Sequence, residues 1–142
     1  MTQLSYFSRP ADGTTLVEIN EILGVARVRN REASITGFML YRHDCFVQVL
    51  EGGREQVSRL LERIMADDRH REINLVGCED VERRTFSNWS MGFLSMREVS
   101  RRKLLEYSDT GDLDLARLDH GSLVELMAEL AELAESSLPD SE

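Results

Sequence analysis

The sequence predicts an α+β fold, in which a five-stranded sheet carries two helices on one face and is followed by two C-terminal helices. Over the first hundred residues, segments with helical spacing of apolar side chains alternate with short strand-like runs. Their order is β-α-β-β-α-β, followed by one more strand. The 142 residues are 42% apolar and 30% charged, which is the composition of one globular domain with a single core.

The first two elements are a short strand at residues 4–7 and a helix at residues 14–29. We expect Asp12 or Thr14 to cap this helix, because a side-chain oxygen there can accept a backbone N–H that has no partner inside the helix. The apolar side chains that recur at helical spacing are Leu16, Ile19, Leu23 and Ala26.

A hairpin and a second helix follow. Residues 34–41 and 45–50 are strand-like runs separated by three residues, which is hairpin spacing. A helix is expected at residues 54–66, and residues 73–81 and 91–96 complete the sheet as two more strands. The apolar stripe of the second helix consists of Val57, Leu60, Leu61 and Ile64.

This order is that of the split βαβ, or ferredoxin-like, arrangement. Because crossover connections between parallel strands are right-handed, few sheet topologies remain. We therefore expect the first and third strands side by side in the middle of the sheet, with both helices over one face.

The C-terminal part is strongly acidic. Residues 100–142 carry 11 acidic and 4 basic side chains, so −7 of the total charge of −9 lies there. Helices are expected at residues 99–107 and 122–135, and the second has an apolar stripe that needs a surface to cover. The exposed sheet face, a second subunit and a partner protein are all open alternatives. The stripe consists of Leu123, Leu126, Met127, Leu130 and Leu133.

Composition narrows the class of protein. A net charge of −9 argues against binding to a nucleic-acid backbone. No run approaches the roughly 20 apolar residues that span a bilayer, and the N-terminus has no secretion signal, so we expect a cytoplasmic protein that does not bind membranes. The two cysteines, Cys45 and Cys78, lack metal-ligand spacing and are expected to be reduced, packed thiols.

Neither a metal site nor an enzyme is expected. The three histidines, His43, His70 and His120, are too scattered in sequence to suggest a metal site. There is no Gly-rich phosphate loop, no His-Glu-x-x-His and no nucleophile elbow.

One polar side chain, Gln48, lies in a strand whose neighbours are apolar on both faces. It shares a face with Phe46 and Leu50, and an unpaired amide there would cost about 1–3 kcal/mol. Tyr6 on the adjacent strand is the expected partner, because a phenol can both donate and accept a hydrogen bond. A satisfied Tyr–Gln pair in an ordinary core is the alternative interpretation.

Three further groups of residues have two interpretations each. Asn30 is either an ordinary residue at the end of the first helix or an amide that binds a planar imide edge. Trp89, near Phe86, Met91 and Phe93, is either core or a cofactor contact. The last group is either a solvated helix end or a phosphate site, and consists of Arg63, Asp67, Arg69, His70 and Arg71.

One ordered set of motifs runs through about residues 2–97. It consists of Tyr6, Arg29-Asn30, ITGFMLY from Ile35, FVQVLEG from Phe46, DDRH from Asp67 and FSNWSM from Phe86. This set resembles the BLUF family, the blue-light sensors that use FAD. The succession of Ile-Thr-Gly, Gln-Val-Leu-Glu-Gly and Trp-Ser-Met is its most specific part.

The resemblance implies a flavin between the two helices, namely FAD, with FMN and riboflavin as alternatives. Tyr6, Gln48 and the flavin edge would be linked by hydrogen bonds, and Asn30 would bind the carbonyl and imide positions of the ring. Arg29 stands where relatives carry a second amide or a histidine. Arg63, Asp67 and Arg69 would lie near the ribityl and phosphate end, and the candidates for packing against the ring are Ile22, Leu23 and Ile64.

The resemblance also implies a photoreceptor. After blue light, Tyr6 would release an electron and a proton, Gln48 would end rotated or tautomerised, and the flavin absorption would move to the red. Trp89 and Met91 would pass the change to the last strand. The chain would be a short, stand-alone sensor, with a photosensor domain at residues 1–97 and an acidic helical extension at residues 98–142 for output or dimerisation, acting on an unidentified partner.

Two other functions are open at this point. A flavin-free ferredoxin-like interaction module would bind a partner through its acidic tail helix, and Gln48 would then be satisfied by protein groups alone. A small enzyme acting on an acyl or phosphate substrate would need a nucleophile beside a base, and the sequence does not reveal such a pair.

Overall fold

The computed structural model describes residues 1–42, 44–115 and 117–135. The strands are β1 (Thr2–Pro10), β2 (Thr36–Arg42), β3 (Cys45–Gly52), β4 (His70–Asp80) and β5 (Gly92–Ser95). The helices are α1 (Leu16–Glu32), α2 (Arg54–Ala66), the 3-10 turn η1 (Met96–Glu98), α3 (Arg101–Leu105) and α4 (His120–Glu135). The predicted order of elements is confirmed.

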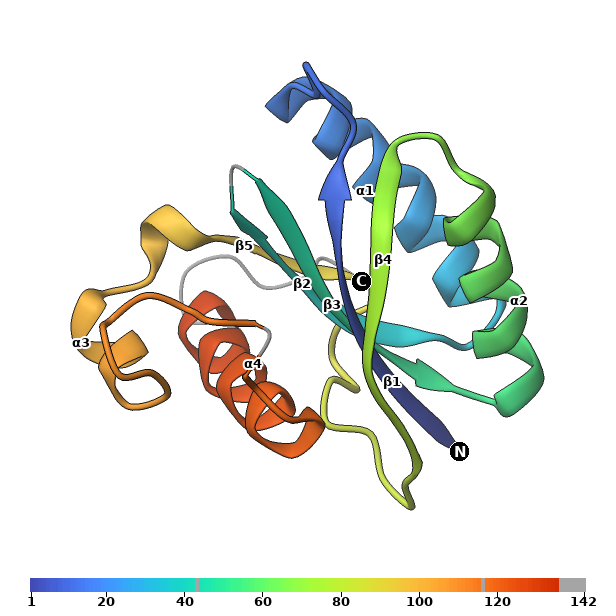
Figure 1. The fold of residues 1–142 in the computed structure, drawn as a ribbon. Coiled ribbons are helices and arrows are strands. Elements are labelled where there is room, and N and C mark those ends of the chain that lie inside the picture. Colours follow the sequence, from blue (N-terminus) through green and yellow to red (C-terminus); the bar gives the residue numbers. More distant parts are fainter. Residues whose placement is uncertain (43, 116, 136–142) are drawn as a thin grey trace.

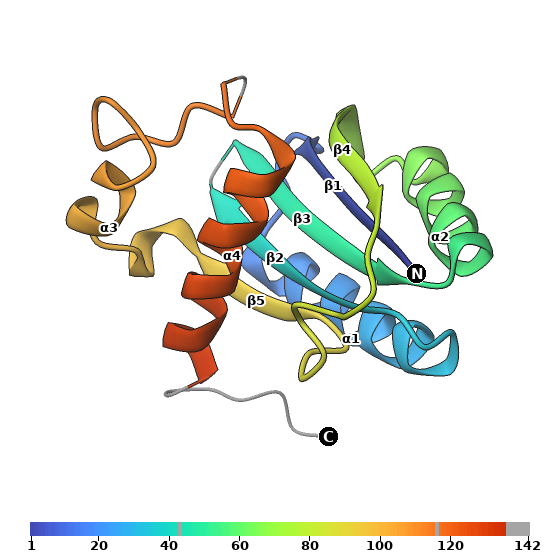
Figure 2. The ribbon, with the colours of Figure 1, turned by 90° about the horizontal axis from the view of Figure 1, so that it is seen from below.

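The strands form one sheet in the order β4-β1-β3-β2-β5, so the first and third strands lie side by side in its middle, as predicted. β3 pairs antiparallel with β1 and β2, and β5 joins β2 in parallel. Helices α1 and α2 cover one face of the sheet, and α4 crosses the opposite face (Figure 1; Figure 2). The predicted ferredoxin-like α+β architecture is therefore present.

The start of α1 differs from the prediction. The N-cap is Thr15, whose backbone is extended and whose Oγ1 accepts the Glu18 N–H at 3.3 Å. Thr14 instead donates its hydroxyl to the carbonyl of Ala11 at 2.6 Å, and Asp12 does not cap the helix. Adjacent polar residues compete for one cap position, and the chain direction on leaving β1 decides between them.

The sheet separates two apolar clusters. The helix-side cluster, between the sheet and helices α1 and α2, consists of Leu4, Tyr6, Ile19, Leu23, Ile35, Met39, Phe46, Leu50, Val57 and Met91. The α4-side cluster includes Phe38, Leu40, Val47, Val49, Phe86, Trp89 and Leu94 from the sheet and its loops, and Leu123, Leu126, Met127 and Leu130 from α4.

The C-terminal helix covers the sheet of its own chain, which was one of the three surfaces left open. Its predicted stripe is buried except for Leu133, which is 55% exposed. Ala134 takes the inward position and is 5% exposed, because the turn of an α-helix brings residue 134 rather than 133 back under Leu130. The preceding helix is shorter than predicted, at residues 101–105.

The two cysteines behave differently. Cys45 is buried, as predicted, and burial raises the pKa of its thiol to about 11. The prediction of a packed thiol is wrong for Cys78, which is exposed because it lies on β4, an edge strand of the sheet. His43, in the predicted hairpin turn, lies outside the described residues.

The burial of α4 leads to a prediction about stability. Leu126→Ala removes a fully buried side chain from the α4-side cluster, and we expect it to lower the free energy of unfolding by about 2–5 kcal/mol. Glu132→Ala, at an exposed position of the same helix, should change it by less than about 0.5 kcal/mol. Urea unfolding of both variants measures the difference, and equal stabilities would contradict the docking of α4 on the sheet.

Candidate functional site

Tyr6 and Gln48 lie directly opposite each other on the adjacent strands β1 and β3. Both are buried, and the Tyr6 hydroxyl donates a hydrogen bond to Gln48 Oε1. Burial raises the pKa of the Tyr6 phenol far above its usual value, because the phenolate would be desolvated. The phenol is therefore protonated at neutral pH and acts as the donor, which is the contact predicted from the sequence.

The other end of the Gln48 amide points to a sulfur atom. Nε2 of Gln48 donates to Sδ of Met91 at 3.2 Å, and Met91 is part of the helix-side cluster. A thioether is a weak acceptor, and these two contacts use one of the two N–H groups and one of the two carbonyl lone pairs of the amide. The amide thus retains capacity for a further polar partner.

A pocket opens between α1 and α2, above the helix-side cluster. Its ten lining residues come from these two helices and from the turn that follows α2. They are Ile22, Val25, Ala26, Arg29, Asn30, Leu60, Arg63, Ile64, Asp67 and Arg69. Apolar walls with one amide and several guanidinium groups fit a flat ring system that has a polar edge and an anionic extension. The lining therefore suits the flavin implied by the sequence.

The pocket brings together four of the six predicted cofactor-binding residues. Asn30, Arg63, Asp67 and Arg69 line it, whereas Tyr6 and Gln48 do not. These two residues lie deeper, because Tyr6 belongs to the helix-side cluster and Gln48 is buried beside it. The pocket residues Leu60 and Ile64 pack against the same cluster. Of the predicted ring-packing side chains, Ile22 and Ile64 line the pocket, and Leu23 is buried in the helix-side cluster instead.

Asn30 connects the pocket to the segment before β5. It is 1% exposed, and its Nδ2 donates to the Ser90 carbonyl at 2.7 Å. One turn earlier in α1, Nε of Arg27 donates to the Met91 carbonyl at 2.9 Å. Helix α1 thus holds the backbone of the residue whose sulfur faces Gln48. Arg27 could not be identified from the sequence, because the spacing of residues in α1 does not reveal a contact 64 residues away.

Charged side chains gather at one end of the pocket, where the turn that follows α2 forms the wall. The Arg69 side chain donates to the Asp67 carboxylate from Nε, at 2.9 Å to Oδ1 and 3.1 Å to Oδ2, and from Nη2, at 2.7 Å to Oδ2. These hydrogen bonds lower the pKa of Asp67 to about 2. Arg29 and Arg63 also line the pocket, so three guanidinium groups face one carboxylate. An excess of positive charge suits a phosphate group.

The predicted charged cluster is divided in the structure. His70 turns inward, where its ring lies 5.3 Å from that of Phe46 and burial lowers its pKa. Arg71 pairs with Asp12 near the start of α1 at 3.4 Å. Neither His70 nor Arg71 lines the pocket.

The structure also separates Trp89 from Met91. Trp89 belongs to the α4-side cluster, where its ring meets Phe38 edge to face at 5.6 Å, whereas Met91 belongs to the helix-side cluster. Trp89 therefore lies in a core cluster together with Phe86, and Met91 and Phe93 belong to or pack against the cluster on the other face of the sheet. The turn between Phe86 and Gly92 allows neighbouring side chains to reach opposite faces of the sheet.

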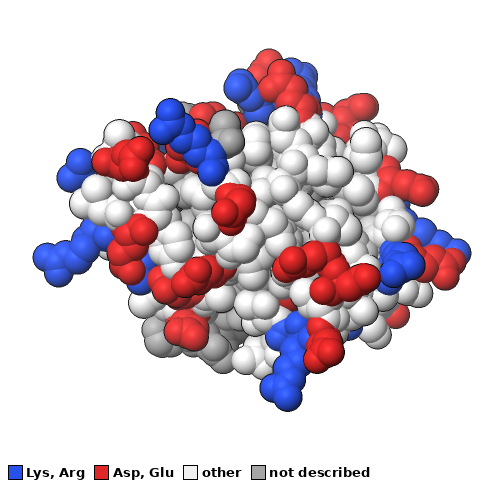
Figure 3. Space-filling view, turned by 60° about the horizontal axis from the view of Figure 1, so that its bottom comes forward, with Lys and Arg blue, Asp and Glu red and all other residues white. Residues whose placement is uncertain are grey.

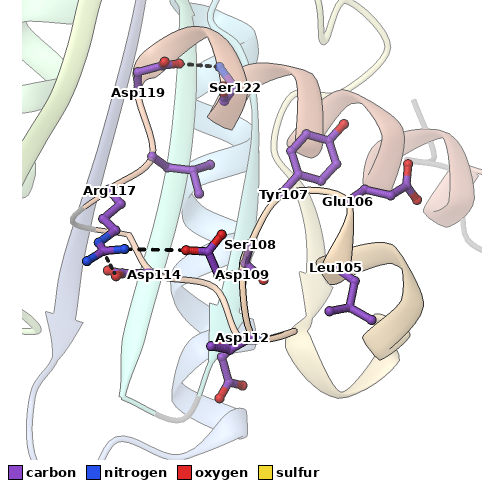
Figure 4. Close-up of a pocket in the computed structure, with 12 residues that line it drawn as sticks. Leu105, Glu106, Tyr107, Ser108, Asp109, Asp112, Asp114, Arg117, Asp119 and Ser122 are labelled. Atoms are coloured by element: carbon purple, nitrogen blue, oxygen red, sulfur yellow. Dashed lines mark hydrogen bonds and ion pairs between the residues drawn. The ribbon is translucent and has the colours of Figure 1, made fainter.

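A second pocket lies in the C-terminal part and is lined by residues between 105 and 122. Figure 4 shows Arg117 paired with both Asp109 and Asp114, and the N–O distances are 3.6 and 3.5 Å. On the face shown in Figure 3, acidic groups are scattered around a wide uncharged area rather than gathered in one patch. None of the predicted site residues lies in this pocket.

The comparisons with known proteins agree with this geometry. The family model described as "BLUF: Sensors of blue-light using FAD" matches residues 1–92. The blue light- and temperature-regulated antirepressor BluF of Escherichia coli (strain K12) is 31% identical over 106 residues, which cover 75% of this chain. The chain spans about a quarter, 26%, of that relative's length.

Two solved structures resemble the whole fold. The photo-activated state of BlsA superposes with a TM-score of 0.81 at 27% identity, covering 91% of this chain and 93% of that one. The dark state of BlrB, a BLUF protein, gives a TM-score of 0.78 at 35% identity, covering 91% and 96%. Within the described residues, no helix has the length and apolar character needed to cross a membrane.

Proposed function

The chain belongs to the BLUF family, the sensors of blue light using FAD, and on that premise we propose that its light signal starts at Tyr6 and Gln48, beneath a flavin held between α1 and α2. The observation that carries this proposal is the buried chain of contacts from the Tyr6 hydroxyl through the Gln48 amide to the Met91 sulfur. It lies in the layer directly under the pocket.

The pocket residues divide into three roles. Ile22 and Ile64, which line the pocket, would pack against the ring, and Asn30 would bind its polar edge. Arg63 and Arg69 neutralise phosphate, with Asp67 holding Arg69 in place through their paired hydrogen bonds. The phosphate contacts favour FAD or FMN over riboflavin, and FAD is our proposal for the native cofactor.

A flavin bound in this pocket supplies the absorption of blue light and, once excited, a strong oxidant. Tyr6 is neutral before excitation, because burial disfavours its phenolate. When Tyr6 loses an electron, its hydroxyl becomes strongly acidic, and the proton leaves along the existing hydrogen bond to Gln48 Oε1. Return of the electron and the proton to Tyr6 leaves the net change in the Gln48 amide, which is rotated or tautomerised.

The change at Gln48 reaches β5 through Met91. In the rotated amide, Oε1 replaces the Nε2 donor that faces Met91 Sδ in this structure, and that hydrogen bond is lost. In this structure the carbonyls of Ser90 and Met91 accept hydrogen bonds from α1, and Trp89 belongs to the cluster that α4 covers on the other face of the sheet. Movement of this loop therefore changes the surface on which α4 rests.

We assign the detection of light to residues 1–97 and the transmission of the signal to a partner to residues 98–142. The proposed output is a contact with another protein, or with a second copy of this chain, rather than a chemical reaction. The relative named an antirepressor supports a protein contact, and the location we propose is the cytoplasm.

Flavin binding is the first test. Purified protein supplied with FAD should be yellow and should release a flavin on denaturation, which chromatography identifies. A protein that stays colourless after FAD is supplied would instead support the flavin-free interaction module, and it would remove the basis of this proposal.

The phosphate contacts lead to a separate prediction. Arg63→Ala removes a guanidinium from the pocket, and loss of a charge-assisted hydrogen bond should weaken binding of FAD and FMN about tenfold or more. Riboflavin has no phosphate, so its affinity should not change. Arg59→Ala, an exposed arginine of α2 paired with Glu55, is the control. Titration of the apoprotein by flavin fluorescence measures each affinity, and equal losses for riboflavin and FAD would refute the assignment.

A further inference from the structure

The first residue of α4, His120, has polar contacts with the sheet at both ring nitrogens. Its Nδ1 lies 2.6 Å from Ser5 Oγ and its Nε2 lies 3.0 Å from Gln3 Oε1, both on β1. The ring sits against Gly77 of β4, where an added Cβ would be 2.4 Å from His120 Cβ. Only a residue without a side chain leaves room for the ring in this position.

The Gln3 amide fixes the hydrogen-bonding roles of His120. Gln3 Nε2 donates to Glu51 Oε2 at 2.9 Å and to Thr85 Oγ1 at 3.2 Å, which turns Gln3 Oε1 towards the histidine. His120 Nε2 must therefore donate to Gln3, and in the neutral ring Nδ1 accepts from the Ser5 hydroxyl. Both nitrogens of the ring thus have partners on β1, and Nε2 also lies 3.5 Å from Glu79 Oε1 of β4.

Glu51 continues this chain of contacts to the loop before β5. Its carboxylate is fully buried and accepts the backbone N–H of Thr85 at 2.7 Å and that of Phe86 at 2.8 Å. The Phe86 carbonyl in turn accepts the N–H of Trp89 at 3.0 Å. A continuous path of buried and partly buried hydrogen bonds thus runs from the start of α4 to the segment that carries Trp89.

The other contacts that hold α4 are of a different kind. Towards the sheet, α4 packs through the apolar contacts of the α4-side cluster, which are not directional. Lys103 Nζ pairs with Glu129 at 2.8 Å, but that contact joins α4 to α3 rather than to the sheet. The contacts of His120 with Ser5 and Gln3 thus hold the N-terminal end of α4 to the sheet by directional hydrogen bonds.

We propose that His120 is a positioning residue of the signal path, which couples the N-terminal end of α4 to the loop of residues 85–91 through Gln3 and Glu51. Movement of this loop on illumination shifts the Thr85 and Phe86 amides, the Glu51 carboxylate follows, and Gln3 loosens its bond to His120. The N-terminal end of α4 then leaves the sheet more readily. This inference rests on the proposed light response and adds the route by which it reaches the tail.

Hydrogen exchange tests this route in the full chain with flavin bound. In the parent protein, amides of residues 121–125 should exchange at least about fivefold faster under blue light than in the dark, the lower end of typical coupling between sites. In His120→Ala, this ratio should fall to about one, while the light-induced absorption shift, measured on the same sample, persists.

Asp119→Ala is the matched control. Asp119 Oδ1 accepts the Ser122 N–H at 2.8 Å, so this variant loosens the same helix end without touching the path through Gln3 (Figure 4). Exchange should be faster in both states, and the light-to-dark ratio should stay at the parental value. Gln3→Met breaks the path but leaves Ser5 beside His120, so its light-to-dark exchange ratio should fall to about one, as in His120→Ala. This variant replaces His120→Ala if the alanine protein fails to fold.

Several outcomes would overturn the coupling. The first is a light-to-dark exchange ratio in His120→Ala or Gln3→Met that equals that of the parent. The second is a ratio of about one in Asp119→Ala. The third is a parent protein whose absorption shifts in light while the exchange of residues 121–125 does not change. A parent protein without an absorption shift would instead show that the proposed light response is wrong.

Discussion

Gln48→Leu should abolish the light-induced red shift while the protein still binds its flavin. The leucine fills a similar volume but has neither the carbonyl that accepts from Tyr6 nor the N–H that donates to Met91. Both ends of the switch are lost at once, so blue light has no amide to rearrange. The light-minus-dark absorption difference should fall to the noise level.

The Gln48→Leu test needs two controls, which are the folding stability of the variant and the same substitution at an exposed position. Leucine at position 48 leaves the buried Tyr6 hydroxyl without its acceptor, which should cost about 1–3 kcal/mol of folding free energy. The variant should therefore be measured at low temperature, with circular dichroism to verify its fold. Gln56→Leu makes the same chemical change at an exposed position of α2 and should keep the full red shift. A Gln48→Leu protein with a parental difference spectrum would show that the amide is not the switch.

Tyr6→Phe should have an effect of similar size for a different reason. It removes one oxygen atom from a fully buried side chain and keeps the ring in the helix-side cluster. The Gln48 carbonyl loses its hydrogen-bond donor. Residue 6 also loses the phenol that would give up an electron and a proton. The flavin should stay bound, and the red-shifted state should not form.

Tyr41→Phe provides the control for the loss of a phenol. Tyr41 packs against Phe46 and Phe93 on the same side of the sheet but makes no contact with Gln48 that the structure shows. This variant should keep the parental spectrum and recovery. If Tyr6→Phe responded to light like the parent, the assignment of Tyr6 as the electron donor would be wrong.

The central pair of the site could be predicted because it depends on local pattern and topology. Gln48 stands out in an apolar strand, and the order of elements places the first strand beside it, which brings Tyr6 opposite. The bounds of α2 were also predicted correctly, since Gly53 precedes a regular apolar stripe. These features are encoded within a few residues or by a general rule of chain connection.

The contacts that hold the site in place were not predictable in this way. His120 meets Gln3 across 117 residues, and Arg27 meets Met91 across 64. Glu51 directly follows the strand-like run 45–50, and an acidic residue in that position was a usable sign of a buried carboxylate with several donors. Such contacts depend on how loops return to the sheet, which periodicity does not report.

The errors at the surface have the same origin. Leu133 and Ala134 differ by one helical position, and the apolar stripe read from the sequence assigned the inward position to the larger side chain rather than to the residue one turn after Leu130. Cys78 is exposed because β4 is an edge strand, and strand order rather than local sequence determines that exposure.

The central claim is that light changes the hydrogen bonds of Gln48 while the flavin stays oxidised. An absorption spectrum of the flavin-loaded protein, recorded before and directly after blue illumination, tests it most directly. We predict a small red shift of the whole flavin band that reverses in the dark. A spectrum that does not change, or one in which the band bleaches without shifting, would contradict the account.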